Sequence, residues 1–286
     1  MDERVRRHLR RPLLALALVG LACAAATAAP RQPSYRVYAI RYATVPAFPV
    51  RYLVTGADTT RTLDIAMTCW LLDGGPGRHV LVDAGFYRPK FLNDWKPAGF
   101  VKPSDAVARA GVPADSITDI IISHVHWDHL DGADLFPNAR IWIQREEYAH
   151  HVGPDGLPLA QAIDTLDAAM LYQLNAAGRV KLVPGDGQEI LPGITVYTGG
   201  KHTFASQYAG VRTAKGIVVV ASDNLYLYEN LERHRPIAQT LDSTSNLAAQ
   251  ERMKKLAASP RLIVPGHDPA VFTRFHAVAE GVVKVE

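Results

Sequence analysis

Four side chains that commonly bind metal ions lie within six residues of one another. They are His124, His126, Asp128 and His129. They follow the apolar run 120–122, which is typical of a buried strand. If that strand continues, His124, His126 and Asp128 point one way and His129 the other, because side chains alternate along an extended chain. Imidazole and carboxylate suit zinc and its first-row neighbours, and the two directions predict a site for two metal ions.

Three further candidate ligands have the same relation to apolar strands. His202, Asp223 and His267 each come shortly after such a run. Open sheets gather their ligands at the carboxyl ends of strands, so we expect these side chains to join the first four. Seven donors exceed what one tetrahedral zinc can use. We therefore predict two zinc ions as cofactors, at a site that other first-row divalent metals would also fit.

The remaining sequence reads as two series of strands, each followed by helices. Strands are predicted over 35–54, with breaks at Pro46 and Pro49, and then at 66–72, 79–83, 119–123, 139–144, 180–183, 194–197, 208–213, 216–221 and 261–264. Helices are predicted at 105–111, 145–151, 160–176 and 245–257, and residues 86–100 read as an irregular loop. This order predicts two packed sheets with helices outside, in one α/β domain over residues 30–286.

The first 29 residues differ from the rest. Five arginines between positions 4 and 11 precede a run at 13–26 made almost entirely of Leu, Ala, Val and Gly, and residues 26–28 offer a small-x-small cleavage site. We expect a signal peptide over residues 1–29, and so an exported, periplasmic or secreted protein without a stable membrane anchor after processing. The arginine pairs leave both Sec and twin-arginine export open, and Cys23 leaves lipid attachment open.

The net charge limits the classes of partner that we expect, and the cysteine content limits the chemistry. Residues 1–29 carry five Arg, Asp2 and Glu3, a net +3, and the whole chain carries +3, so the rest is near neutral (3 − 3 = 0). That balance gives no basis for nucleic acid or an anionic membrane as partner. Cys69 is the one cysteine left after cleavage, and it lies in the apolar run 67–72. We expect it to be a buried small hydrophobe rather than a nucleophile.

The ordered set of candidate ligands resembles a known family. The motif His124-x-His126-x-Asp128-His129, followed by His202, Asp223 and His267, is similar to that of the metallo-β-lactamase fold superfamily. Asp83, within Leu81-Val82-Asp83-Ala84-Gly85, matches that superfamily's first motif, and the resemblance covers about residues 66–270.

This resemblance implies an αββα sandwich with a dinuclear zinc site at one edge. It assigns the first metal to His124, His126 and His202, and the second to Asp128, His129 and His267. Asp223 would bridge both metals, and Asp83 would fix the orientation of a ligand from behind.

Within the superfamily, the chain resembles the N-acyl homoserine lactonase branch. Asp223 is a bridging carboxylate that secreted B3-type β-lactamases lack, and Tyr226 matches the lactonase tyrosine that contacts the substrate carbonyl. The segments 141–148 and 265–269 are also similar to that branch. The segment 199–206 departs from its Gly-His-Thr-Pro-Gly order, so that Lys201 and Phe204 would alter the pocket wall.

The function implied is that of a secreted dinuclear-zinc hydrolase for lactones or esters, above all N-acyl homoserine lactones (quorum quenching). A hydroxide shared by the metals would attack the carbonyl, Tyr226 would stabilise the oxyanion, and Asp128 would relay a proton to the leaving alkoxide. Trp127 is the first candidate for the wall of an acyl groove, followed by Phe86 and Phe204. A small lactone or ester is the expected partner, and residues 150–180 could form a cap or a homodimer contact.

Two alternatives stand beside this reading. Another hydrolase of the same fold, such as a β-lactamase, thioesterase, phosphotriesterase or arylesterase, would share the metal site, because the ligand motif specifies the fold more than the substrate. A non-catalytic periplasmic zinc-binding protein would keep the fold without turnover, although retention of all seven candidate ligands disfavours it.

Overall fold

The computed structural model describes residues 34–286, so the predicted signal peptide and Cys23 lie outside the described residues. Its larger sheet has the strand order β12-β13-β1-β2-β3-β4-β5-β6. Strands β3 to β6 are parallel neighbours, and the other pairs are antiparallel. The strands are β1 (Arg36–Pro49), β2 (Thr62–Asp73), β3 (His79–Val82), β4 (Asp119–Ile121), β5 (Arg140–Gln144), β6 (Val180–Val183), β12 (His276–Ala279) and β13 (Val282–Val285).

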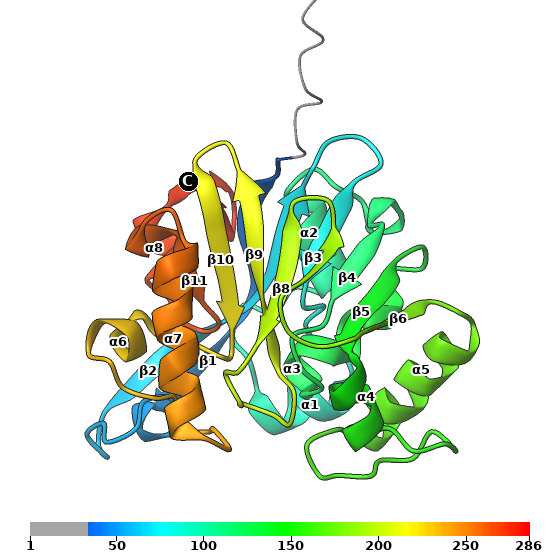
Figure 1. The fold of residues 1–286 in the computed structure, drawn as a ribbon, viewed down its shortest axis with the longest axis horizontal. Helices are drawn as coiled ribbons and strands as arrows, with labels where there is room; N and C mark the ends of the chain where they lie inside the picture. The colour runs from blue at the N-terminus through cyan, green and yellow to red at the C-terminus, as the bar shows by residue number, and fades with distance from the viewer. Residues whose placement is uncertain (1–33) are drawn as a thin grey trace, which may run out of the picture. The chain divides into compact units, whose positions relative to one another are not determined.

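The smaller sheet packs against one face of the larger one (Figure 1). Its order is β11-β10-β9-β8-β7, and only the β10–β11 pair is parallel. Its strands are β7 (Gln188–Leu191), β8 (Ile194–Thr198), β9 (Gln207–Thr213), β10 (Gly216–Ser222) and β11 (Ile263–Pro265).

Helices cover the two outer faces. The larger sheet carries α1 (Pro89–Trp95), α2 (Pro103–Ala108), α3 (Trp127–Leu130), α4 (Arg145–His151) and α5 (Thr165–Ala176), and the smaller sheet carries α6 (Tyr228–Glu232) and α7 (Ser243–Leu256). The short α8 (Val271–Arg274) packs beside the core between the sheets. No helix within residues 34–286 combines the length and apolar character needed to cross a membrane.

Strand alternation explains this layering. In β10, Val218 and Val220 face the core between the sheets, whereas Val219 and Ala221 face the helices α6 and α7. In β2, Trp70 faces the smaller sheet and Leu71 faces the helices of the larger one. Both sides of each strand are therefore apolar, as expected for a sheet covered on both faces. The predicted αββα sandwich is confirmed.

Several local predictions are wrong. Residues 86–100 contain α1, whose Pro89 occupies the first turn, where a missing N–H costs nothing. Pro46 does not break β1, because the strand absorbs it in an irregularity between Val45 and Phe48. Strands β7, β12 and β13 are additional. β12 is exposed along most of its length, so it has no buried pattern to reveal it.

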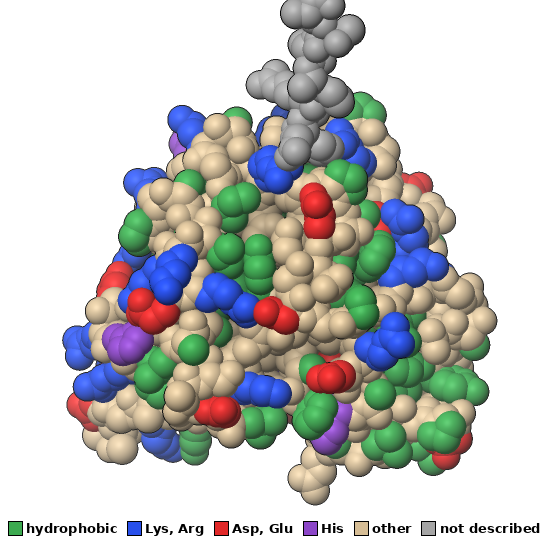
Figure 2. Space-filling model, viewed as in Figure 1, with side chains coloured by type: hydrophobic (Ala, Val, Ile, Leu, Met, Phe, Trp, Pro, Cys, Tyr) green, Lys and Arg blue, Asp and Glu red, His purple; other side chains and the backbone are tan. Residues whose placement is uncertain are grey.

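Charges are mixed over the surface. Figure 2 shows Lys and Arg interspersed with Asp and Glu on the face that carries α7, where Arg252 pairs with Asp186 at 2.7 Å. This distribution agrees with the near-neutral charge computed for the sequence after residue 29.

Candidate metal centre

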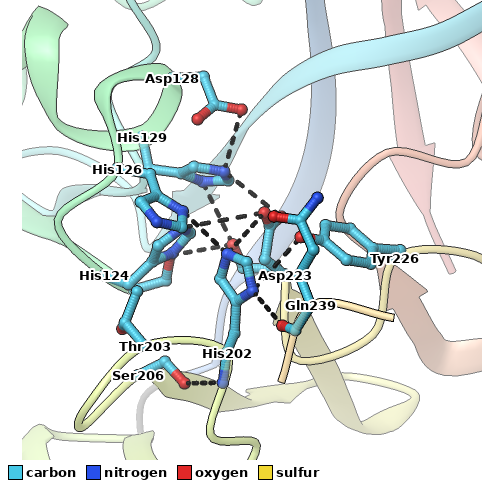
Figure 3. A network of polar contacts seen from close by, with 12 residues as sticks. His124, His126, Asp128, His129, His202, Thr203, Ser206, Asp223, Tyr226 and Gln239 are labelled. Atoms are coloured by element: carbon cyan, nitrogen blue, oxygen red, sulfur yellow. Dashed lines mark hydrogen bonds and ion pairs between the residues drawn. The ribbon is translucent and has the colours of Figure 1, made fainter. Parts of the chain in front are cut away.

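The seven candidate ligands meet where strands of both sheets end. His124 follows β4, His202 follows β8, Asp223 directly follows β10, and His267 follows β11. The structure brings them together as two adjoining groups. Figure 3 labels all of them except His267. The first consists of His124, His126, His202 and Asp223, and the second of Asp128, His129 and His267.

The conformation of the central motif differs from the prediction. Strand β4 ends at Ile121, Val125 lies in a bend, and α3 begins at Trp127. Asp128 therefore does not point with His124 and His126, because the helical turn carries it into the second group together with His129.

Nitrogen atoms converge in the first group. His126 Nδ1 lies 3.0 Å from His124 Nε2 and 2.9 Å from His202 Nε2. Asp223 Oδ2 lies 3.4 Å from His202 Nε2 and 3.8 Å from His124 Nε2. Ligands about 2.0–2.1 Å from a tetrahedral zinc stand roughly 3.3 Å apart, so this spacing fits one ion.

The second group is built on the other oxygen of the same carboxylate. Asp223 Oδ1 lies 3.0 Å from His267 Nε2 and 3.3 Å from His129 Nε2. Asp128 Oδ2 lies 3.4 Å from His129 Nε2 and 3.6 Å from His267 Nε2. Asp223 thus offers one oxygen to each group, which is the arrangement of a bridging carboxylate.

The outer nitrogens of three imidazoles are held by acceptors. His202 Nδ1 is 2.8 Å from the backbone oxygen of Gln239, His267 Nδ1 is 2.9 Å from that of Ala66, and His129 Nδ1 is 2.8 Å from Asp83 Oδ2. A carbonyl or carboxylate oxygen only accepts, so each Nδ1 carries the proton. In the neutral imidazole, each Nε2 is then left with its lone pair facing the centre.

Asp83 organises this support. It is fully buried at the end of β3, with a left-handed φ of +62°. Its Oδ1 accepts from the Ser123 amide at 2.8 Å, and its Oδ2 accepts from the Ser222 hydroxyl at 2.7 Å as well as from His129. The Ser123 hydroxyl also donates to Asp83 and lies 2.9 Å from His124 Nδ1. One carboxylate therefore connects a ligand of each group.

The residues present fit two metal ions. Within the described chain, His129 Nε2 and Asp223 Oδ1 are buried without any hydrogen-bond partner, and both face the same point as His267. Burial lowers the pKa of His126 to about 3, which keeps it in the neutral form that ligates. Burial opposes charge on His129, but the carboxylates of Asp223 and Asp128 outweigh it and raise its pKa well above the usual value. A metal cation at the centre would balance the negative charge of these carboxylates, which in its absence favours protonation of His129.

Comparison with known proteins agrees with this geometry. Residues 66–267 match the family model of the metallo-beta-lactamase superfamily. The chain belongs to that superfamily. It is 30% identical over 223 residues to an N-acyl homoserine lactonase of a Bacillus species, covering 72% of this chain and 82% of that one. It is also 29% identical over 222 residues to an N-acyl homoserine lactonase of Bacillus cereus, with the same coverage.

Solved structures share the fold. One is an N-acyl homoserine lactone hydrolase with N-hexanoyl-L-homoserine bound at its catalytic metal centre. It matches with a TM-score of 0.70 at 20% identity and covers 86% of this chain and 98% of that one. Together with the lactonase relatives, the matching fold and ligand set identify this superfamily member as a lactonase-like metallo-hydrolase.

A cavity of about 190 Å³ opens over both groups, and it is lined by His126 and Asp223 of the first and by Asp128 and His267 of the second. Tyr226 lines it, with its hydroxyl 3.3 Å from His202 Nδ1, and burial raises its pKa well above the usual value, so the phenol keeps its proton. Trp127 also lines it and stacks on Phe91 at 4.9 Å and on Trp95 at 5.1 Å between ring centres.

Two of the predicted substrate contacts lie elsewhere. Phe86 is fully buried behind Trp127, at 4.6 Å between ring centres, so it supports that ring and cannot touch a substrate. Phe204 is 38% exposed and stacks on His150, and both line a second cavity of about 240 Å³ that His126 also lines.

Outside the metal motif, the sequence predicts that His150, His151 and His234 face solvent and that His276 packs on a helix or turn. His150 and His234 are exposed, as predicted. His151 is buried, because the helical repeat of α4 places it on the inward face with Glu147. His276 is exposed on β12 rather than packed. Cys69 is buried in β2, as predicted.

Sequence reasoning missed other residues at the site. Ser123 and Ser222 touch Asp83, Gln239 holds His202, and Trp95 lines the cavity. Pro89, placed as a helix start, was the available signal for the helix that carries Trp95. For the other three, side-chain or backbone contacts arise only once the strands are assembled.

Proposed function

We propose that this chain is a dinuclear zinc hydrolase that opens N-acyl homoserine lactones. The observation that carries the proposal is the position of Asp223, whose two oxygens face separate nitrogen-rich groups beneath one cavity. The names of the lactonase relatives, and the product bound in the solved neighbour, support this substrate class.

The seven ligands would hold the metal pair, and the protein would set the geometry of the reaction. When bound, zinc would polarise the lactone carbonyl and make water acidic enough to ionise near neutral pH. The supports at Asp83, Ala66 and Gln239 keep the imidazoles from turning, so the site is oriented before substrate arrives.

Tyr226 would stabilise charge on the carbonyl oxygen. Its phenol is protonated and faces the cavity, so it can donate a hydrogen bond to the oxygen as the carbonyl carbon becomes tetrahedral. The ring packs near His267, with ring centres 5.8 Å apart, which limits its movement.

Asp128 would move the proton. Burial alone would raise the pKa of Asp128, but the neighbouring His129 lowers it below the usual value, so the carboxylate is ionised. It lines the cavity and can accept the proton released as water adds to the carbonyl carbon. It would then return that proton to the ring oxygen as the ring C–O bond breaks, giving an N-acyl homoserine.

An apolar groove continues from the cavity and would hold the acyl chain. It measures about 460 Å³ and shares Val45, Phe48, Trp95 and Gln239 with the cavity. Its other walls are Pro46, Ala47, Pro49 and Tyr52. An alkyl chain would leave water on entering this groove, which favours binding by roughly 25 cal/mol per Å² of apolar surface buried.

A substrate panel tests the proposal. Residues 30–286 loaded with zinc should open N-decanoyl homoserine lactone faster than a cephalosporin, a thioester, an aryl ester or an aryl phosphate. The release of protons measures the formation of the hydroxy acid. A cephalosporin or an aryl phosphate as the best substrate would replace the lactonase proposal with another hydrolase of this fold. Two bound metals without turnover of any substrate would support the non-catalytic alternative.

Export is proposed on residues 1–29 alone. Fusing these residues to a reporter enzyme should deliver the reporter to the periplasm of a bacterial host, and replacing Arg6 and Arg7 by Lys distinguishes twin-arginine export from Sec export. A reporter retained in the cytoplasm would contradict the proposal.

A further inference from the structure

Gln239 stands where the cavity over the metal ligands meets the apolar groove. Four residues line both spaces: Val45, Phe48, Trp95 and Gln239. Of these four, Gln239 alone has a side chain that both donates and accepts hydrogen bonds. In Figure 3 it lies on the same side of His202 as Tyr226.

The backbone of Gln239 is fixed independently of its side chain. Its carbonyl oxygen accepts from His202 Nδ1 at 2.8 Å. The neighbouring Ile237 amide donates to Asn246 Oδ1, and the Ala238 amide donates to the carbonyl of Leu53. The Gln239 carboxamide makes only one long contact among the described residues, from Nε2 to the Tyr52 carbonyl at 3.4 Å. It is exposed and therefore free to exchange that contact for a ligand.

We propose that the Gln239 carboxamide recognises the amide that joins the lactone ring to the acyl chain, and so selects N-acylated amino lactones over plain alkyl lactones. This inference rests on the proposed function. A substrate with its ring at the metal ligands and its alkyl chain in the groove must place the linking atoms at the junction of the two spaces. There, an amide N–H and C=O would otherwise face Val45, Phe48 and Trp95, whereas a carboxamide can pair with both.

The test compares two lactones in metal-loaded enzyme. Gln239→Met keeps the length of the side chain and removes its hydrogen-bonding groups. It should raise KM for N-decanoyl homoserine lactone about tenfold with little change in kcat, because the contact is present before and during the reaction. That factor corresponds to about 1.4 kcal/mol. The kcat/KM for γ-dodecalactone, which has no amide, should change less than twofold.

A control and a second readout keep the result interpretable. Gln173→Leu on α5 makes a similar change at an exposed position outside both spaces, and should leave both substrates unaffected. Metal content of Gln239→Met should equal that of the wild type, since the bond to His202 comes from the backbone.

The outcomes separate the two proposals. Wild-type enzyme that opens neither lactone would overturn the proposed function, and this inference with it. Wild-type activity with an unchanged KM in Gln239→Met, or with equal losses on both lactones, would overturn this inference alone. If the wild type opens only the N-acylated lactone, the test uses that substrate alone. A KM raised about tenfold in Gln239→Met with little change in kcat then supports this inference, and an unchanged KM overturns it.

Discussion

Asp83 Oδ2 lies 2.8 Å from Nδ1 of His129, so a carboxylate at the end of β3 fixes the orientation of an imidazole that is 46 residues further along the chain. The same carboxylate also receives hydrogen bonds from Ser123, which follows β4 of the larger sheet, and from Ser222, which ends β10 of the smaller sheet. Asp83 therefore couples the packing of the sandwich to the orientation of the metal ligands.

Replacing Asp83 should weaken metal binding without removing any ligand. Asn tolerates the left-handed backbone at this position, but its amide group cannot accept from all the donors that now meet at Oδ2. We expect Asp83→Asn to lower zinc affinity about 10–100-fold, measured by competition with a chelator. Asp119→Asn is the matched control, because Asp119 is also buried but pairs with Arg140 and Trp142. Equal zinc affinity in Asp83→Asn and Asp119→Asn would contradict the role given to Asp83.

Metal stoichiometry should follow the two groups. The wild type is expected to bind two equivalents of zinc. His126→Ala and His267→Ala each remove a ligand from a different group, so each should retain about one equivalent after dialysis, measured by elemental analysis. His234→Ala, at an exposed position paired with Glu251, should retain two. Full occupancy in both ligand variants would show that the groups do not hold separate ions.

Much of this site could be predicted because its chemistry is local in sequence. Four of the seven ligands come from one short motif, and the rule that ligands gather at strand ends placed His202, Asp223 and His267 with them. The grouping within the motif was not predictable from strand alternation, since the helical turn at Trp127 redirects Asp128.

The remaining errors have tertiary causes. Phe86 looks like a pocket residue in sequence, but the fold places it beneath Trp127, where it is fully buried. The role of Gln239 depends on a backbone carbonyl that meets His202 only after β8 and the segment before α7 come together. A backbone carbonyl carries no residue-specific signal, so the sequence gives no indication of such contacts.

Tyr226 should affect the rate rather than the binding of metal. Tyr226→Phe keeps the ring against His202 and His267 and removes only the hydroxyl. We expect kcat for the lactone to fall about a hundredfold, with two metals still bound, because a hydrogen bond to the developing oxyanion is lost. Steady-state kinetics on the zinc-loaded protein measures this, and Tyr172→Phe on the exposed side of α5 serves as the control. An unchanged kcat would assign the phenol to packing alone.

Stability should depend on pH through Asp167, a buried carboxylate that is not one of the metal ligands. Burial, reinforced by the neighbouring Asp131, raises the pKa of Asp167 to about 8, although Arg88 contacts it at 2.7 Å. In the unfolded chain its pKa is near 3.9. The folded protein therefore binds more protons than the unfolded chain between these values. This contribution to stability is complete below the unfolded pKa and is lost as the pH rises toward 8.

The slope from this one group is at most about 1.4 kcal/mol per pH unit. Asp167→Asn stays neutral, so its free energy of unfolding should fall less than that of the wild type between pH 5 and 8. Urea unfolding of the zinc-loaded proteins at several pH values measures the difference. Asp115→Asn makes the same change in charge at an exposed position and should follow the wild-type curve. Parallel curves for the wild type and Asp167→Asn would mean that Arg88 keeps Asp167 ionised throughout this range.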